Sequence, residues 1–191
     1  MNYIRKLVNN CSPTLLGLKP SNLFSISNED YTAMEEQIEK TNLKMSFKGL
    51  KTKVFCRCKY RKLIFLYNED YLEKTLLNSE VHNYLISIGY PSRFDLDTYI
   101  LHLVQKVENE IYFPHEIGLF LGMPKEDVMG FINMQGKGFK CFGYWKVYGD
   151  EDMCKRLFEE YDKSKHYLED RYNEGIFFEC LLREREEICQ K

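Results

Sequence analysis

Apolar residues recur at helical spacing over most of this chain, and capping residues, glycines and prolines mark where the repeats stop. The clearest repeat lies between 95 and 109. Its apolar positions form one face of a helix: Leu96, Tyr99, Ile100, Leu103, Val104 and Val107. Further helices are expected at 3–10, from 29 onward, from 68, and at 79–89, 114–121, 124–134, 150–173 and 176–188.

Short apolar runs predict a small antiparallel sheet between these helices. Its strands are expected at 22–26, 43–47, 53–58, 62–67 and 139–148, the middle three forming a meander. In the strand at 53–58, Lys53 and Arg57 share one face with Phe55, and the other face is apolar. One face is therefore expected to be basic and solvated, with a single aromatic residue. The pattern predicts an α+β fold, a sheet of about four or five strands with helices mainly on one side.

Length and composition fit one soluble domain. The 191 residues predict a single domain over 1–191, with 150–191 as a helical C-terminal extension of it. No apolar run approaches the roughly 18 residues that a membrane-spanning helix needs, and the first residues do not resemble an export signal. We therefore expect a cytoplasmic protein with no membrane association.

The net charge of −2 hides an uneven distribution. Nine of the 27 basic residues lie between 40 and 68, where no acidic residue occurs, and the other 18 accompany all 29 acidic residues. This segment is either an anion-binding face or a lysine-rich edge protected against strand pairing. The candidate basic patch consists of Lys51, Lys53, Arg57, Lys59 and Arg61.

The stretch 113–122 carries the densest candidate chemistry. Pro114 suits the first position of a helix, which places His115 and Glu116 in its first turn. A neutral histidine there can donate a hydrogen bond or act as a base. Alternatively, Glu116 caps free amides and His115 fills a crevice. With Cys11, these two residues are the candidate catalytic groups.

The segment from 116 to 134 also has the spacing of a helix-turn-helix, with Gly118, Gly122 and Val128 at the expected positions. Its charge argues against DNA binding, because Glu126 and Asp127 at the start of the second helix would face phosphates. Alternatively, Gly118 and Gly122 serve only to let two helices approach closely. We expect no sequence-specific DNA binding.

Two further features suggest ligand contacts. Glycines flank Lys137 and leave backbone amides that could bind an anion. In the following strand, Tyr144, Lys146 and Tyr148 share one face, whereas Trp145 is expected in the core. The candidate ligand-binding residues are Lys19, Lys137, Tyr144, Lys146 and Tyr148.

Three segments resemble one family. They are CSPTLLGLK at 11–19, PHEIGLFLG at 114–122 with its continuation to 136, and GYWKVYGD at 143–150. Together they resemble the uncharacterised bacterial family catalogued as domain of unknown function 3793. The resemblance covers about 4–165. It implies no activity, cofactor or catalytic residue, and suggests only a link to redox or metal physiology.

The three shared segments lead to our functional hypothesis. Cys11 is expected in a partly exposed turn before Pro13, and the loop from Cys11 to Lys19 is expected to pack against the start of the 114–121 helix. Cys11, Lys19, His115 and Glu116 would then form one pocket for a small anionic or redox-active ligand. Whether the protein is an enzyme stays open.

Two alternatives remain. The chain could be a nucleic-acid-binding or regulatory module that uses 116–134 and the basic strands at 44–62. It could also be an interaction module for an acidic protein or a redox partner. No cofactor or metal site is assigned from the sequence.

The seven cysteines are expected to be reduced, because their number is odd, no C-x-x-C pair occurs and no export signal is recognised. Titration of the denatured protein with a thiol reagent, after purification without reductant, should return all seven thiols. Recovery of five would show a disulfide and contradict this expectation.

Overall fold

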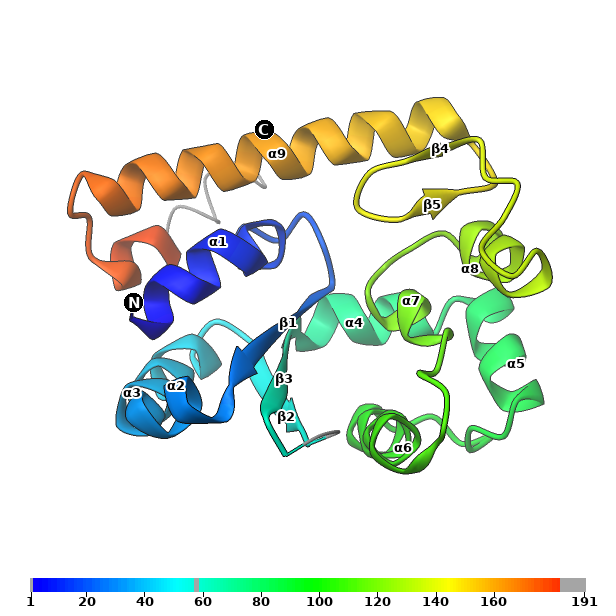
Figure 1. Cartoon of the computed structure of the whole chain (residues 1–191), viewed down its shortest axis with the longest axis horizontal. Coiled ribbons are helices and arrows are strands. Elements are labelled where there is room, and N and C mark those ends of the chain that lie inside the picture. Colours follow the sequence, from blue (N-terminus) through cyan, green and yellow to red (C-terminus); the bar gives the residue numbers. More distant parts are fainter. Residues whose placement is uncertain (1, 57–58, 183–191) are drawn as a thin grey trace. The chain divides into compact units, whose positions relative to one another are not determined.

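The computed structural model describes residues 2–56 and 59–182 and divides into two compact units. Unit 1 comprises the chain up to Tyr71 and from Tyr161 onward, and unit 2 comprises Leu72–Glu160 (Figure 1). Two helices continue from one unit into the other, α4 (Glu69–Leu76) and α9 (Glu151–Asn173). The expectation of a single domain stays a prediction.

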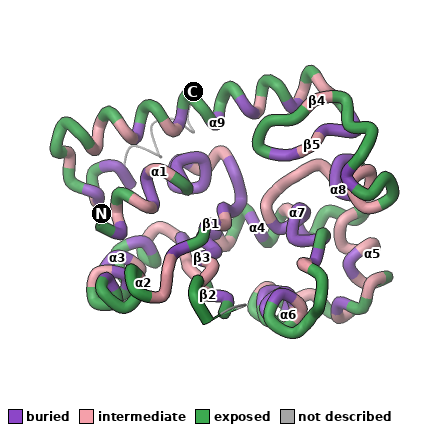
Figure 2. Tube along the Cα trace, viewed as in Figure 1, coloured by how far each residue is buried: buried purple, intermediate pink, exposed green. Residues whose placement is uncertain are grey.

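Unit 1 is built around a three-stranded antiparallel sheet with the order β1-β3-β2. Its elements are α1 (Tyr3–Leu15), β1 (Ser21–Ser27), α2 (Asn28–Ala33), α3 (Glu35–Ser46), β2 (Leu50–Phe55) and β3 (Arg61–Asn68). On one face of this sheet, Phe24, Ile64 and Val54 occupy the same level in the three strands. This face packs with α1, α3 and the chain after 161 into one core, whose buried positions are purple in Figure 2.

The other face of the sheet is not the solvated basic face that the sequence suggested. Phe55, Phe65 and Tyr67 stack on it with ring centroids 5.7 and 5.4 Å apart, and all three rings are buried. Phe55 and Lys53 share this face, so the basic side chains border a buried aromatic stack. The prediction of a solvated face was wrong because the alternation of residues along a strand assigns them to two faces but does not show whether either face is buried.

The predicted strand at 43–47 is the end of helix α3. Leu43 and Phe47 are 64% and 81% exposed, whereas Ile38, Thr41 and Met45 are buried at helical spacing. Only β2 and β3 of the expected meander exist, and β1 supplies the third strand.

Helix α1 continues past the point where proline was expected to end it. The sequence placed Cys11 in a partly exposed turn, but α1 runs to Leu15 with Pro13 inside, and Cys11 is fully buried. The Ser12 hydroxyl donates to the Val8 carbonyl within the same stretch. Pro13 lies in the last turn of α1, where its missing amide donor costs the helix one hydrogen bond near its end.

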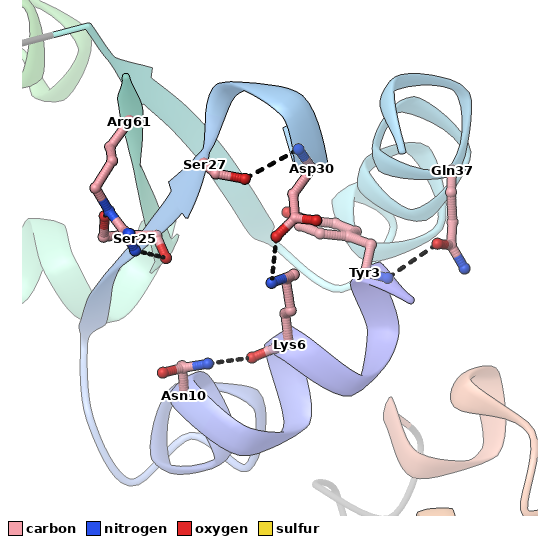
Figure 3. Close-up of polar contacts among 8 residues, drawn as sticks. All are labelled: Tyr3, Lys6, Asn10, Ser25, Ser27, Asp30, Gln37 and Arg61. Atoms are coloured by element: carbon pink, nitrogen blue, oxygen red, sulfur yellow. Dashed lines mark hydrogen bonds and ion pairs between the residues drawn. The ribbon is translucent and has the colours of Figure 1, made fainter. Parts of the chain in front are cut away.

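Polar contacts join α1, α2 and α3 to one another or to the neighbouring chain (Figure 3). The Ser27 hydroxyl accepts from the Asp30 amide at 3.0 Å and caps α2. The Asp30 carboxylate in turn pairs with the Lys6 ammonium of α1 at 3.2 Å. The Gln37 side chain of α3 accepts from the Tyr3 amide at 2.9 Å.

Unit 2 is helical apart from one short hairpin. It contains most of α4, then α5 (Ser79–Ser87), α6 (Leu96–Asn109), α7 (Ile117–Phe120), α8 (Lys125–Asn133), β4 (Cys141–Phe142), β5 (Lys146–Val147) and the start of α9. The expected strand at 139–148 is therefore two strands of two residues each. The α+β class is confirmed, with separate sheets of three and two strands in place of one sheet of four or five.

No helix among the described residues has the length and apolarity needed to span a bilayer.

Candidate functional site

A cavity of about 320 Å³ lies within unit 2, between α7, α8 and residues 144–146 of the β4–β5 hairpin. Its lining residues are His115, Ile117, Gly118, Met123, Asp127, Val128, Phe131, Tyr144, Trp145 and Lys146. The walls are mostly apolar. Their charged or hydrogen-bonding side chains are His115, Asp127, Tyr144, Trp145 and Lys146. Two of the sequence segments that were singled out, 113–122 and 143–150, thus meet at one site.

The close approach of α7 and α8 forms the floor of this cavity. A Cβ atom on Gly118 would lie 2.7 Å from Cγ2 of Val128, so only glycine fits there. Gly122 makes the turn between the helices with a φ of 74°, a conformation that glycine adopts without strain. The spacing that resembled a helix-turn-helix therefore produces this close packing.

His115 lies at the mouth of the cavity and not in a helix. Helix α7 begins at Ile117, and His115 and Glu116 form a turn before it, which corrects the predicted start. The imidazole is exposed and meets the Phe131 ring edge-to-face at 5.0 Å. With only four residues, α7 provides little of the dipole on which the sequence argument relied.

Glu116 occupies the N-cap position of α7, but its side chain makes no capping hydrogen bond and does not line the cavity. Its buried carboxylate forms an ion pair with the ammonium of Lys106 on α6. The same ammonium lies 5.5 Å from the Tyr90 ring centroid. The nearby Glu116 carboxylate adds to the effect of burial in raising the pKa of Tyr90. Glu116 is therefore part of the packing of α6 against the 114–116 turn.

Lys146 supplies the positive charge of the cavity. Its ammonium donates to the Gly136 carbonyl at 2.8 Å and lies 5.8 and 5.0 Å from the ring centroids of Phe131 and Phe139. No carboxylate within the described ranges forms an ion pair with it. An ammonium between rings and one carbonyl keeps donors available for an anion.

Asp127 is the buried carboxylate beneath the cavity. Its Oδ1 accepts from the amides of Tyr148 and Gly149 at 2.7 and 2.8 Å. Its Oδ2 accepts from Trp145 Nε1 at 2.7 Å and from the Cys154 thiol at 3.3 Å. Asp127 is also the third residue of α8, where a helix N-terminus favours negative charge. Four donors and the helix end together stabilise a buried carboxylate.

This placement corrects the argument about DNA binding. The sequence placed Asp127 with Glu126 on an exposed recognition surface, but Asp127 is 2% exposed and accepts hydrogen bonds from Trp145 and Tyr148. Only Glu126 remains on the surface. The expectation that the chain lacks sequence-specific DNA binding stays a prediction.

Phe158 of α9 holds the two aromatic residues of the cavity wall. Its ring lies 5.7 Å from that of Tyr144 and 4.6 Å from that of Trp145, the latter edge-on. A Cβ atom on Gly143 would lie 2.4 Å from the Phe158 ring, so the hairpin can press against α9 only with glycine there. Trp145 is 7% exposed, as expected of a core residue, but it also lines the cavity.

The remaining candidates near the hairpin take other positions. The buried Tyr148 packs against Gly130 and is absent from the cavity lining. The exposed Lys137 is absent from it as well. The predicted anion nest is not formed by the amides of Gly136 and Lys137, because these donate to the carbonyls of Phe131 and Met134.

Cys11 and Lys19 lie together in unit 1, whereas His115 and Glu116 belong to unit 2. Burial raises the pKa of the Cys11 thiol far above its ordinary value, with Lys19 opposing the shift. Burial lowers the pKa of Lys19 to about 8, with Cys11 opposing. A thiol that stays protonated is a poor nucleophile. The shared pocket of all four residues stays a prediction.

The environment of Lys19 explains how a cation is accommodated in the core of unit 1. Its ammonium lies 5.8 Å from the centroid of the Tyr161 ring, and the residue is 4% exposed. Its amide donates to the Pro13 carbonyl, which fixes the turn after α1. The side chain neither extends to solvent nor pairs with a carboxylate in the described part of the chain.

The basic patch of unit 1 is largely engaged in local contacts. Lys51 pairs with Glu69 at 2.5 Å, Arg61 donates to the Ser25 hydroxyl at 2.5 Å, and Lys59 lies over the Tyr60 ring. Lys53 is exposed on β2, an edge strand, as expected for edge protection. Arg57 lies outside the described residues. A function for this patch stays a prediction.

The described cysteines are all free thiols: Cys11, Cys56, Cys141, Cys154 and Cys180. No group of three or more histidine, cysteine or acidic residues in the described ranges is arranged to bind a metal ion.

Sequence reasoning found His115, Tyr144 and Lys146 but missed the groups that connect them. Asp127 was interpreted as a surface charge, and Phe131 and Met123 were not considered. An acidic residue three positions into a helix is so common that it gives no sign of burial. The one available hint was the accumulation of glycines at 118, 130, 143 and 149, which indicates close packing in this region.

Comparison with known families assigns the chain to one of them. A family model described as protein of unknown function (DUF3793) matches residues 7–182. The chain belongs to this family. The match includes all three segments that carried the resemblance and extends further toward the C-terminus than the sequence suggested. Searches of curated proteins and of solved structures gave no match.

Replacing Asp127 tests its structural role. In the Asp127→Asn variant the amide nitrogen would face N–H or S–H donors, so we expect a loss of about 2–4 kcal/mol in the free energy of unfolding. Urea unfolding of Asp97→Asn is the matched control, because Asp97 is an exposed acid in the first turn of α6. Equal stability of the two variants would contradict the role assigned to Asp127.

The lowered pKa of Lys19 predicts a pH dependence. Between about pH 8 and 10.5, folded Lys19 has lost its proton while unfolded Lys19 retains it, so stability rises with pH in this window. The unfolding free energy of the wild type, minus that of Lys19→Met, should increase by up to about 3 kcal/mol from pH 7.5 to 10. With the exposed Lys163→Met as control, this difference should stay flat. A flat profile for Lys19→Met would contradict the prediction.

Proposed function

We propose that the protein binds a small organic anion in the unit 2 cavity, with its apolar part in the cavity and its charge at Lys146. The observation that carries this proposal is the position of Lys146. Its ammonium borders an apolar cavity and contacts only rings and one carbonyl among the described groups. A negatively charged ligand is the natural complement of such a group.

The cavity has the general features of a ligand site. Its volume of about 320 Å³ lies at the lower end of the usual range, and its walls combine apolar side chains with a few polar groups. Fixed packing of Gly118 on Val128 and of Gly143 on Phe158 supports a preformed shape. A preformed cavity binds with a smaller loss of side-chain entropy.

His115 gives the site a titratable group at its mouth. It contacts Phe131 and is exposed, so it is free to donate to a bound anion or to accept from a bound hydroxyl. The proposal keeps the small anionic ligand suggested by the sequence. It moves the binding residues from Cys11 and Lys19 to Tyr144 and Lys146. Binding, not catalysis, is proposed.

Calorimetric titration with octanoate and with 2-naphthoate tests this function, because both carry an apolar body and one carboxylate. We expect at least one of them to bind and to change the emission of Trp145, the only tryptophan of the chain. In Lys146→Met the affinity should fall about tenfold, because the ion pair with the ligand is lost while a side chain of similar length is kept.

Lys163→Met is the control variant, since Lys163 is exposed on α9 and does not line the cavity. Its affinity should equal that of the wild type. The proposal is wrong if neither anion binds, or if Lys146→Met binds both anions as tightly as Lys163→Met does.

A further inference from the structure

The aromatic character of the cavity narrows the class of ligand. Four of the ten lining residues carry rings: His115, Phe131, Tyr144 and Trp145. Phe158 orients Tyr144 and Trp145 from behind, and His115 meets Phe131 edge-on. Met123 adds a polarisable thioether to the wall. Rings and thioether sulfur both interact favourably with a bound ring, beyond the contribution of buried area.

The polar groups of the cavity limit the ligand to one negative charge. The Asp127 carboxylate lines the cavity, but all its contacts are used by Trp145, Tyr148, Gly149 and Cys154. It therefore offers no free acceptor to a ligand, and its charge disfavours a second anionic group nearby. Lys146 is the one cation in the lining, so a single carboxylate or similar group suffices to balance it.

The volume limits the size of the ligand. A cavity of about 320 Å³ lies at the lower end of the range for small-molecule sites, so it suits a small ligand. One or two fused rings with a carboxylate have this size. A flavin nucleotide or a dinucleotide is too large to be enclosed.

We propose that the ligand is an aromatic monoanion of one or two rings, whose rings lie among Phe131, Tyr144 and Trp145 and whose anionic group contacts Lys146. This inference rests on the proposed function and makes it specific. It distinguishes the site from one for phosphates, which usually offers several N–H donors.

Three matched probes separate the contributions of ring and charge. They are 2-naphthoate, its saturated counterpart trans-decalin-2-carboxylate, and the neutral 2-naphthylmethanol. By calorimetry, 2-naphthoate should bind about tenfold more tightly than the saturated acid, because one or two ring contacts are worth about that factor. It should also bind about tenfold more tightly than the alcohol, which cannot form an ion pair with Lys146.

Variants of the cavity wall test whether its rings cause the preference for 2-naphthoate over the saturated acid. In Tyr144→Leu and in Phe131→Leu, the ratio of affinities for 2-naphthoate and the saturated acid should fall several-fold. The exposed Phe177→Leu of unit 1 should leave the ratio unchanged. Because the Tyr144 side chain is 39% exposed, its replacement tests the inference even if Phe131→Leu folds poorly.

The outcomes separate the two proposals. Equal affinity for 2-naphthoate and the saturated acid, with loss of both in Lys146→Met, would overturn the aromatic class and leave the anion site intact. Equal affinity for 2-naphthoate and the alcohol would overturn the monoanion. No binding of any probe would overturn the proposed function itself.

Discussion

A single buried carboxylate holds together the parts of unit 2 from which the cavity is built. Asp127 lies in the first turn of α8, and its two oxygens accept from the Trp145 ring, the Tyr148 and Gly149 amides and the Cys154 thiol. These donors come from the hairpin, from the segment before α9 and from α9 itself. Because a buried carboxylate without a cation is stable only when it is fully hydrogen-bonded, these segments must keep their relative positions.

Close backbone approaches around Asp127 reinforce this arrangement. A Cβ atom would lie 2.7 Å or less from a neighbouring side chain at four glycines: Gly118, Gly130, Gly143 and Gly149. All four belong to the segments that carry the family resemblance. These contacts fix the walls of the cavity, so Lys146 and the rings are held in place before any ligand arrives.

The sequence was informative where periodicity alone determines structure. The helix at 96–109 and the start of the long helix after Asp150 were predicted closely, since caps and an apolar stripe suffice to define them. The predictions from sequence were wrong where contacts between distant residues determine the structure. Leu43 and Phe47 are apolar yet exposed, so the end of α3 resembled a strand. Helix α1 continues through Pro13, where a local rule favoured a break.

At the candidate site, too, some residues could be predicted from the sequence and others could not. His115, Tyr144 and Lys146 were identified by residue type within unusual segments, and the structure brings all three to one cavity. Asp127 could not be identified, because a helix N-terminal acid is normally solvated and only its tertiary donors show that it is buried. Cys11 and Lys19 stood out for the same reason as His115, yet they lie in unit 1, where burial suppresses thiolate formation.

The central claim is that a small anion binds in the cavity beneath His115 and Lys146. Methyl NMR during titration with 2-naphthoate tests it most directly, because Ile117, Met123 and Val128 line the cavity while Ile38 and Met45 lie in the core of unit 1. We predict saturable shifts for the methyl groups of these three cavity residues and none for those of the two unit 1 residues. Shifts confined to unit 1, or no saturable shift at all, would contradict it.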